Sequence, residues 1–356
     1  MVADVTVVGT GIIALTAAIE IADRGRSVRL VGTTHSGNAS SAAGGMLAPS
    51  VGRESGSAYD FAVASRDRYP AFAAALSERS GRPVPINTAG ILEVALTETE
   101  AAELKDSIER PSRWLSAEEL AREEPGFAPA FGAVMHPLDG SVEPLPLLDA
   151  LRAVVASHDG ITTAREDCCE LNASELGCSV LTGMENRFAS DYVVLAAGVW
   201  TPLIVGAGKA AESVQPLRGQ MVAFNSTAVR HTSCGAGGYL IPRTDGCIVA
   251  GGTMERAGFE SVTTPDAIQM ICARAQTLCP ALANASIHSS WAGLRPATPD
   301  LLPIIGADPE RPRVIYACGH SRNGILLAPL TAEVVADLVT GTAPRHDISR
   351  FLPGRY

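Results

Sequence analysis

The chain has 356 residues, of which 46% are hydrophobic and 19% charged, and its formal net charge is −10. This length and composition allow a large core, either as two domains or as one α/β domain with an insertion. Lys and Arg are scattered, which argues against nucleic acid and acidic membrane surfaces as partners. The longest apolar stretch, at the N-terminus, is interrupted by glycines and Glu20, so it fits neither a membrane span nor a signal peptide. We therefore expect a cytoplasmic protein.

The eight cysteines are most simply explained as buried thiols of an intracellular protein. Cys168 and Cys169 are adjacent, and the chain contains no C-x-x-C pair. His231 and Cys234 form an isolated H-x-x-C, while the other histidines are scattered. The sequence therefore predicts no metal site.

The N-terminal segment predicts a strand, a tight turn, a helix and a second strand. An apolar run at 5–8 stops at Gly9, and apolar residues then recur with helical spacing over 13–21. A second run rich in β-branched residues follows at 28–31. This order is typical of a βαβ unit.

The turn of this unit reads Gly9-x-Gly11-x-x-Ala14. A dinucleotide-binding unit needs small residues at these places, for the turn itself, for the close approach of a pyrophosphate and for helix–strand packing. The phosphates would contact the free N–H groups at the start of the helix, where the helix dipole favours negative charge. The alternative is an ordinary βαβ unit with a glycine turn.

The acidic residue that usually follows the second strand and binds ribose hydroxyls is absent. Gly32 occupies this place, followed by Thr33 and Thr34. Either a threonine hydroxyl or backbone replaces the carboxylate, or the site accepts a 2′-phosphate as in NADP. No arginine lies near Gly32 to pair with such a phosphate, so we favour the first alternative.

Residues 36–52 form a run of tiny residues without the periodicity of a strand or an amphipathic helix. A flexible loop is one interpretation. The other is that residues 40–45 are small because a large flat ligand passes against their backbone. We favour the ligand, because a linker seldom contains Met46, Leu47 and Pro49.

The rest of the chain alternates between two patterns. We expect helices at 58–80, 98–108, 144–156 and 265–278 and after Gly324, a short helix opened by the capping box of Ser116 and Glu119, a short strand at 165–171 followed by a hairpin, and buried strands at 191–200 and 313–319. Residues 84–142 and 214–290 instead show antiparallel alternation. The fold class is thus α/β plus α+β: a Rossmann-like nucleotide-binding domain of residues 1–83, 143–213 and 291–356, interleaved with a mostly antiparallel β substrate domain of residues 84–142 and 214–290.

Three further stretches carry a family resemblance: Ser-Ala-Ala-Gly-Gly-Met-Leu-Ala-Pro at 41–49, Trp-Ala-Gly-Leu-Arg-Pro-Ala-Thr-Pro-Asp-Leu-Leu-Pro-Ile-Ile-Gly at 291–306, and Gly-His-Ser-Arg-Asn-Gly-Ile-Leu-Leu-Ala-Pro at 319–329. With the opening unit they resemble the FAD-dependent amine oxidases of the D-amino-acid oxidase group, and most closely its glycine-oxidising branch, which serves thiamine biosynthesis. The resemblance covers nearly the whole chain in the same order. It implies that the dinucleotide is FAD.

The resemblance also implies roles for individual residues in binding FAD. Beside Gly9, Gly11 and Ala14, these are Ile12 and Ile13 at the pyrophosphate, Gly32 and Thr33 at the adenosine ribose, Ser40, Ser41, Gly44, Gly45 and Met46 beside the flavin, Cys168 as a backbone contact near the adenine, and His320, Ser321, Arg322, Asn323, Gly324, Ile325 and Leu326 around the flavin ring. Related sarcosine oxidases attach their flavin through a cysteine near the position of Arg295. No cysteine occurs there, so we expect the FAD to be non-covalent.

Arg295 and Arg322 are the candidate ligands for a substrate carboxylate. A carboxylate in a dry pocket needs a paired cation, and the planar fork of arginine suits it bidentately. The resemblance implies that Arg295 is the main ligand and Arg322 a second contact. The alternative for each is a surface or interdomain salt bridge, but the small and apolar neighbours of Arg295 favour a buried role.

Tyr239 and Met254 match positions that form the wall of the family's substrate pocket, although each could instead be core of the β domain. Gly237 stands where the family usually has histidine, which would open the pocket. No catalytic acid or base is proposed, because an amine that arrives deprotonated needs none.

The function that we expect is oxidation of glycine or a similar small amine, such as sarcosine or a small D-amino acid. The products would be an imine, then an oxo acid and ammonia, with molecular oxygen reduced to hydrogen peroxide. The alternatives are a dehydrogenase that uses another acceptor, a flavin-binding subunit of a larger complex, and an NAD(P)-linked enzyme. The family often forms homo-oligomers, which the sequence itself does not establish.

Overall fold

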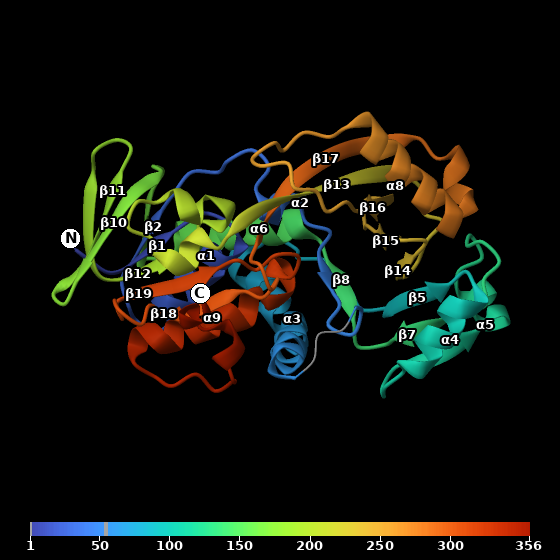
Figure 1. The fold of residues 1–356 in the computed structure, drawn as a ribbon, viewed down its shortest axis with the longest axis horizontal. Coiled ribbons are helices and arrows are strands. Elements are labelled where there is room, and N and C mark those ends of the chain that lie inside the picture. The colour runs from blue at the N-terminus through green and yellow to red at the C-terminus, as the bar shows by residue number, and fades with distance from the viewer. Residues whose placement is uncertain (1, 53–55) are drawn as a thin grey trace.

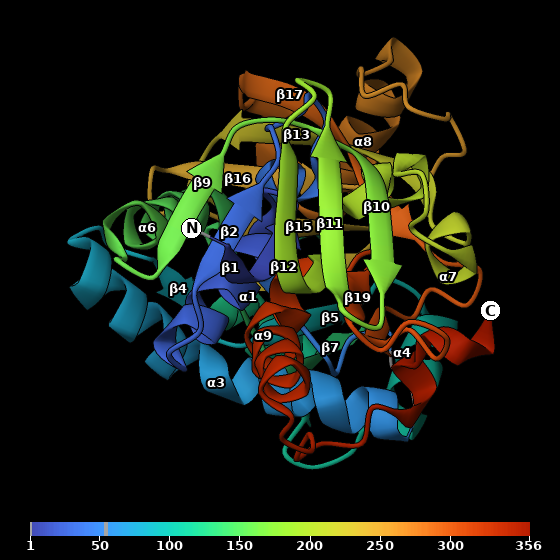
Figure 2. The ribbon, with the colours of Figure 1, turned by 90° about the vertical axis from the view of Figure 1, so that its left-hand side faces the viewer.

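The computed structural model describes residues 2–52 and 56–356. Its first sheet comprises β1 (Ala3–Val8), β2 (Val28–Val31), β9 (Ile161–Ala164), β10 (Cys168–Ser174), β11 (Gly177–Thr182), β12 (Arg187–Leu195), β18 (Ile304–Ala307) and β19 (Val314–Cys318). The strands β9, β2, β1, β12 and β19 run parallel in that order. The hairpin of β10 and β11 pairs with the first half of β12, and β18 pairs with β19, both antiparallel. Figure 2 looks onto this hairpin and the parallel strands beside it.

Helices cover one face of this sheet: α1 (Ile12–Asp23), α3 (Ser57–Ser80), α6 (Pro144–Ser157) and α9 (Gly324–Thr340). Val7 of β1 packs into the core that these helices share, while Val8 packs into a second core on the opposite face. The second core includes Ala210 and Ala211 of α7 (Lys209–Glu212) and Ile204, which directly follows η1 (Gly198–Leu203). Because β1 is buried on both faces, its sequence is a continuous apolar run rather than an alternating one.

The second sheet comprises β5 (Ile91–Ala95), β6 (Arg113–Ser116), β7 (Gly132–His136), β13 (Gln215–Asn225), β14 (Thr232–Gly235), β15 (Gly238–Pro242), β16 (Cys247–Gly251) and β17 (Ile287–Ala297). It is antiparallel except where β14 meets β5. Val222 and Phe224 of β13 pack under α8 (Pro265–Leu278), whereas Met221 and Ala223 face the other side. Figure 1 shows β13 and β17 extending from the first sheet to the α8 end.

Shorter elements complete the structure: α2 (Ala39–Ala42), β3 (Met46–Leu47), β4 (Ile86–Asn87), α4 (Glu98–Asp106), α5 (Ala117–Glu123), β8 (Gly140–Val142), η2 (Pro280–Asn284), η3 (Ser349–Phe351) and η4 (Pro353–Arg355). The strands β3, β8 and β4 form a small antiparallel sheet. The expected capping box of Ser116 and Glu119 is present at α5. Among the helices described, none is both long and apolar enough to cross a membrane.

Residues 36–52 contain one short helix, α2, which Asn38 caps by accepting a hydrogen bond from Ser41 N at 3.0 Å. The strand expected at 165–171 begins three residues later, at Cys168, and the expected hairpin follows it as β10 and β11. β9 ends at Ala164 and β10 begins at Cys168, so Asp167 lies in the connection between a parallel and an antiparallel strand.

The expected domain boundary between residues 290 and 291 falls inside β17. The pairing of β17 with β13 begins with Ile287 opposite Phe224 and ends with Ala297 opposite Gln215, so the whole strand belongs to the second sheet. A boundary at 290/291 would therefore cut one continuous strand. We propose that the substrate domain extends to residue 297, with the other boundaries as expected.

Candidate active site

A cavity of about 750 Å³ lies where the two sheets meet. It runs from the carboxyl ends of β1 and β2 to β15 and the residues that follow β16, and its size is typical of ligand and cofactor sites. Most residues that the sequence singled out contribute to its walls: Gly9, Gly11, Ile12, Ile13, Gly32, Thr33, Ser40, Gly44, Gly45, Met46, Cys168, Tyr239, Met254, Arg295 and residues 320–326. Ala14 instead packs in the core with no exposed surface, and Ser41, whose backbone N–H donates to the capping side chain of Asn38, does not contribute to the cavity wall.

The glycine turn after β1 is sterically required. Gly9 has a φ of +129°, and a Cβ there would lie 2.3 Å from the carbonyl oxygen of Ala196. Gly11 is the N-cap of α1 and has no side chain to accept from the first N–H groups of the helix. Ser40 Oγ accepts from Ile12 N at 3.0 Å, so Ser40 lies at this helix start rather than farther along the cavity. The turn therefore presents backbone N–H groups where an anion could bind.

A hydrogen-bonded cluster lies beyond β2. Thr10 Oγ1 donates to the carbonyl oxygen of Thr33 at 2.9 Å, which ties the glycine turn to the end of β2. Thr33 Oγ1 donates to Asp167 Oδ1 at 2.5 Å, and His35 Nε2 lies 3.0 Å from the same oxygen. The His35 ring stacks on Trp200 with centroids 4.6 Å apart. Asp167, His35 and Trp200 all line the cavity, and none of them is among the site residues that the sequence predicts.

The start of α9 forms another part of the cavity wall. Asn323, its N-cap, makes no capping hydrogen bond through its side chain, so the first amides of α9 face the cavity uncapped. Ser321 N donates to the carbonyl oxygen of Pro296 at 2.9 Å, which holds this helix start against the end of β17. Ser321 Oγ is buried and has no hydrogen-bond partner within the described residues.

His320 lies fully buried beside these amides. Its Nε2 is 3.1 Å from Thr331 Oγ1, and burial lowers the pKa of His320 to about 3. The imidazole is therefore neutral at physiological pH. It is therefore a weak base, and it forms part of the cavity wall.

Arg295 presents a cation to the cavity from β17. Its Nη1 donates to the carbonyl oxygen of Thr253 at 2.9 Å. The guanidinium lies over Gly219, where a Cβ would be 2.0 Å from Nη1, so only glycine leaves room for it. No acidic side chain pairs with Arg295 in the part of the chain that the structure describes.

Tyr239 lies next to this cation. Partial burial raises the pKa of Tyr239, while Arg295, within hydrogen-bonding reach, lowers it. The phenol therefore stays neutral and can donate or accept a hydrogen bond. Cys234, which lies opposite Tyr239 in the β14–β15 pair, also reaches the cavity, and desolvation raises the pKa of its thiol to about 12.

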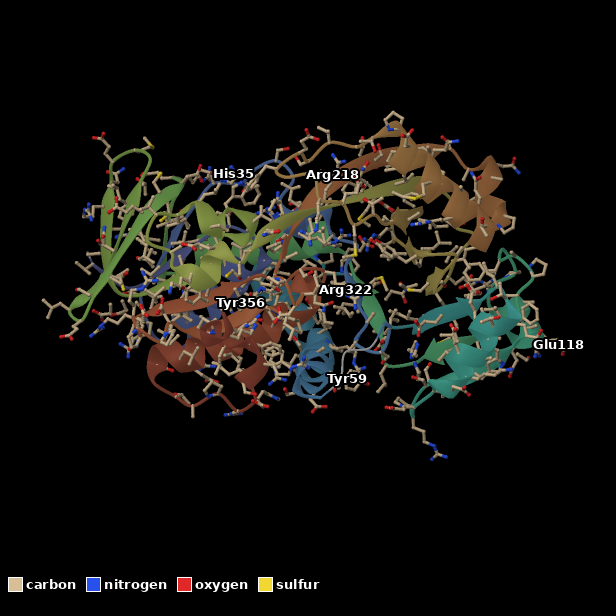
Figure 3. All side chains as sticks on the ribbon, viewed as in Figure 1. His35, Tyr59, Glu118, Arg218, Arg322 and Tyr356 are labelled. Carbon is tan, nitrogen blue, oxygen red and sulfur yellow. The ribbon has the colours of Figure 1, made fainter. Side chains whose placement is uncertain are left out.

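Arg322 lies near the middle of the molecule, between the two sheets (Figure 3). Its Nη2 donates to the carbonyl oxygen of Gly52 at 3.1 Å, and its side chain is exposed. Met254 lines the cavity but is 57% exposed, so it lies at the rim rather than in a closed wall. The structure thus brings Arg295, Arg322, Tyr239 and Met254 to one cavity, and Arg295 is the less exposed of the two arginines.

The donor set fits a dinucleotide cofactor. Two helix starts present amides to the same cavity, one at the glycine turn, where Ser40 accepts from Ile12 N, and one at α9, where Asn323 makes no side-chain cap. The unpartnered Ser321 hydroxyl lies beside the second. Amides at helix starts suit phosphates and electron-rich ring edges. Within residues 2–52 and 56–356 no group of three His, Cys, Asp or Glu side chains is arranged to hold a metal ion.

Sequence comparisons agree with this geometry. The family model described as "FAD dependent oxidoreductase" matches residues 4–338. The glycine oxidase of Geobacillus kaustophilus is 32% identical over 98% of this chain and 96% of its own length. The bifunctional protein ThiO/ThiG of Synechocystis is 34% identical over 99% of this chain, which spans only 54% of that longer relative.

Solved structures show the same fold. The crystal structure of the Geobacillus kaustophilus glycine oxidase matches with a TM-score of 0.92 at 32% identity, covering 99% of each chain. The iminodiacetate oxidase of Chelativorans matches with a TM-score of 0.87 at 22% identity, which supports the fold alone. With the family model and these relatives covering nearly all of its length, the chain belongs to the DAO family of FAD-dependent oxidoreductases and is an amine oxidase of the glycine oxidase type.

Proposed function

We propose that the chain oxidises the amine of glycine or of a similarly small compound, such as sarcosine or a small D-amino acid. In the reaction the Cα hydrogen leaves as a hydride and the amine becomes an imine. Water then converts the imine to an oxo acid and ammonia, or methylamine where the substrate is sarcosine. Molecular oxygen takes up the two electrons with two protons as hydrogen peroxide. The relatives named glycine oxidase support this substrate class.

The observation that carries the proposal is the unpaired cation at Arg295. A guanidinium inside a largely apolar cavity is costly unless an anion neutralises it, and no carboxylate of the described residues does so. An α-amino acid supplies such a carboxylate one bond from its reacting Cα. Arg295 would bind it bidentately, with the neutral Tyr239 hydroxyl as an additional donor. Arg322 would be a second contact nearer the rim.

The cofactor would lie along the cavity between the two helix starts. When bound, FAD supplies the redox chemistry by accepting the hydride. Gly9, Gly11 and the first amides of α1 would bind the pyrophosphate, and the amides at the start of α9 would face the ring. Gly44 and Gly45 also have a packing reason to be small, because a Cβ would lie 2.9 Å from Ile241 Cδ1 and 2.0 Å from the carbonyl oxygen of Val142, respectively.

No side chain of the cavity needs to act as a base. The neutral His320 is hydrogen-bonded to Thr331, and its pKa lies far below physiological pH. The raised pKa of Tyr239 means that its phenol keeps its proton. The amine would therefore react in its deprotonated form. The role of the protein is to fix the carboxylate at Arg295 and so aim the Cα hydrogen.

Anaerobic mixing with a panel of glycine, sarcosine and small D-amino acids tests the proposal. The expected result is bleaching of the oxidised flavin absorbance by at least one of them, followed by consumption of oxygen and formation of peroxide when air is admitted. Bleaching without oxygen uptake would indicate a dehydrogenase, and no bleaching by any small amine would indicate a purely flavin-binding role. Release of the flavin by acid precipitation is expected if it is held non-covalently.

A further inference from the structure

The end of β2 lacks the acidic residue that binds ribose hydroxyls in many dinucleotide sites, but the adjacent strand compensates for it. In the first sheet β9 lies next to β2 and parallel to it, with Val31 opposite Ala164. Carboxyl ends of parallel strands meet at one edge of a sheet, so residues after β9 reach the place where the usual acid would be. Asp167 is three residues beyond Ala164.

Asp167 is fixed in this place by contacts to the segment that follows β2. Its Oδ1 accepts from Thr33 Oγ1 at 2.5 Å and lies 3.0 Å from His35 Nε2. Both contacts use one oxygen, and Oδ2 has no hydrogen-bond partner in the described ranges. The side chain is 49% exposed, and Asp167, Thr33 and His35 all contribute to the wall of the cofactor cavity. His35 lies toward the hairpin side of Arg322 in Figure 3, as an adenosine end remote from the substrate requires.

We propose that Asp167 binds the adenosine ribose of FAD, with Oδ2 accepting from its hydroxyl groups. Thr33 and His35 act as positioning residues, because they occupy Oδ1 and so orient the carboxylate. Hydrogen bonds to an ionised acceptor are the stronger kind, which is why an acid serves better here than the threonine hydroxyl alone. The same negative charge repels a 2′-phosphate, so the cluster excludes NADP-type ligands.

This inference depends on the FAD-binding activity of the family and not on the proposed amine substrate. The competing explanation is structural: Asp167 could serve only to tie Thr33 and His35 together. The two differ in their dependence on the ligand. If Asp167 binds the ribose, the protein binds FAD more tightly than an analogue without ribose hydroxyls. If Asp167 only holds Thr33 and His35 in place, the two ligands bind equally well.

The test is a measurement of FAD affinity by quenching of flavin fluorescence, with apoprotein prepared from wild type, Asp167→Asn and Asp167→Ala. The matched control is Asp159→Asn, which removes the same charge from the exposed turn before β9, outside the cavity. Each protein is titrated with FAD and with an FAD analogue whose adenosine lacks both ribose hydroxyls.

For wild type and Asp159→Asn, we expect the analogue to bind about tenfold more weakly than FAD. Asp167→Asn and Asp167→Ala should lose about tenfold in affinity for FAD but little for the analogue, so that the two ligands become similar. Wild type that binds both ligands equally would overturn the proposal. The proposal would also be overturned if Asp167→Asn still preferred FAD over the analogue as strongly as wild type does, or if it lost affinity equally for both ligands. If Asp167→Ala does not fold, the Asn variant and the wild-type comparison still decide.

Discussion

At the scale of single residues, Arg295 and Gly219 form a dependent pair. The Arg295 guanidinium occupies the space in which a side chain of residue 219 would lie, with 2.0 Å between Nη1 and a Cβ built on Gly219. The clash would be with the end of a flexible side chain, so the strand can accept alanine if Arg295 moves. The position of the cation is thus set by the absence of a neighbouring methyl group.

We therefore predict that Gly219→Ala raises the KM for the amino-acid substrate about tenfold or more while FAD affinity stays unchanged, because the displaced guanidinium no longer meets the carboxylate. Steady-state kinetics and flavin titration measure the two effects. Gly354→Ala is the control, since a Cβ there has no neighbour within 4 Å. An unaltered KM in Gly219→Ala would contradict the assignment of Arg295.

His320 couples stability to pH. Burial lowers its pKa from 6.5 to about 3 in the folded state. Below pH 6.5 the unfolded chain binds a proton at His320, whereas the folded chain does not. The stability that the neutral His320 contributes is therefore fully present above the unfolded pKa of 6.5 and is lost as the pH falls. The loss is about 1.4 kcal/mol per pH unit down to the folded pKa.

We predict that the free energy of unfolding of His320→Gln, which keeps a hydrogen-bond partner for Thr331, depends less on pH than that of wild type. Between about pH 7 and about pH 5, wild type should lose about 2 kcal/mol more in its free energy of unfolding than the variant. Urea titrations of both FAD-saturated proteins at the two pH values measure this difference. Equal losses would show that His320 is protonated in the folded protein.

At the scale of elements, an ion pair connects the first and last helices of the nucleotide-binding unit. Nη1 of Arg24, the C-cap of α1, lies 2.5 Å from Asp337 Oδ1 on α9. Asp337 is buried, whereas Arg24 is partly exposed. Both helices begin at the cavity, so their packing fixes the distance between the two amide-bearing helix starts.

We predict that Arg24→Met lowers the free energy of unfolding by about 1–3 kcal/mol, because it leaves the Asp337 carboxylate buried without its cation. This predicted loss is smaller than the cost of breaking a fully buried ion pair, because Arg24 is partly exposed to water. Chemical denaturation measures the change, and Arg26→Met, at an exposed neighbouring position, should shift it by less than about 0.5 kcal/mol. A loss as small as in the control would show that the pair contributes little.

Elements specified by local patterns could be predicted from the sequence. The βαβ unit, the capping box at α5 and the helix α8 at 265–278 depend on spacing within one segment. The break between β9 and β10 could not be predicted, because β9 is defined by pairing with β2, far away in the chain. The full length of β17 could not be predicted for the same reason, since its register with β13 is a tertiary property.

The residues of the candidate site likewise divide into those that a local motif marks and those that only tertiary pairing brings together. Arg295 and the start of α9 could be found because they lie in contiguous motifs with a family resemblance. Asp167 could not, since nothing around it in the sequence marks it as a partner of Thr33. Only the adjacency of β2 and β9 brings the two side chains together.

At the scale of the whole molecule, the cavity exists because β17 and the segment after β2 hold the two sheets together. Leu294 N donates to the carbonyl oxygen of Gly37 at 2.8 Å, and Trp291 Nε1 donates to that of Ala42 at 3.1 Å. Gly293 lies so close to α2 that a Cβ there would be 2.3 Å from the Cβ of Ala42. The same strand that docks onto α2 carries Arg295, so sheet packing places the cation beside the cofactor cavity.

The most direct test of this account compares glycine with glycinamide, which lacks the carboxylate charge, in wild type and Arg295→Met, by the rate of anaerobic flavin bleaching. We predict that wild type strongly prefers glycine, and that Arg295→Met loses about a hundredfold with glycine but little with glycinamide while retaining FAD. Equal rates of the two proteins with glycine, or equal losses with both compounds, would contradict the claim that Arg295 holds the substrate carboxylate.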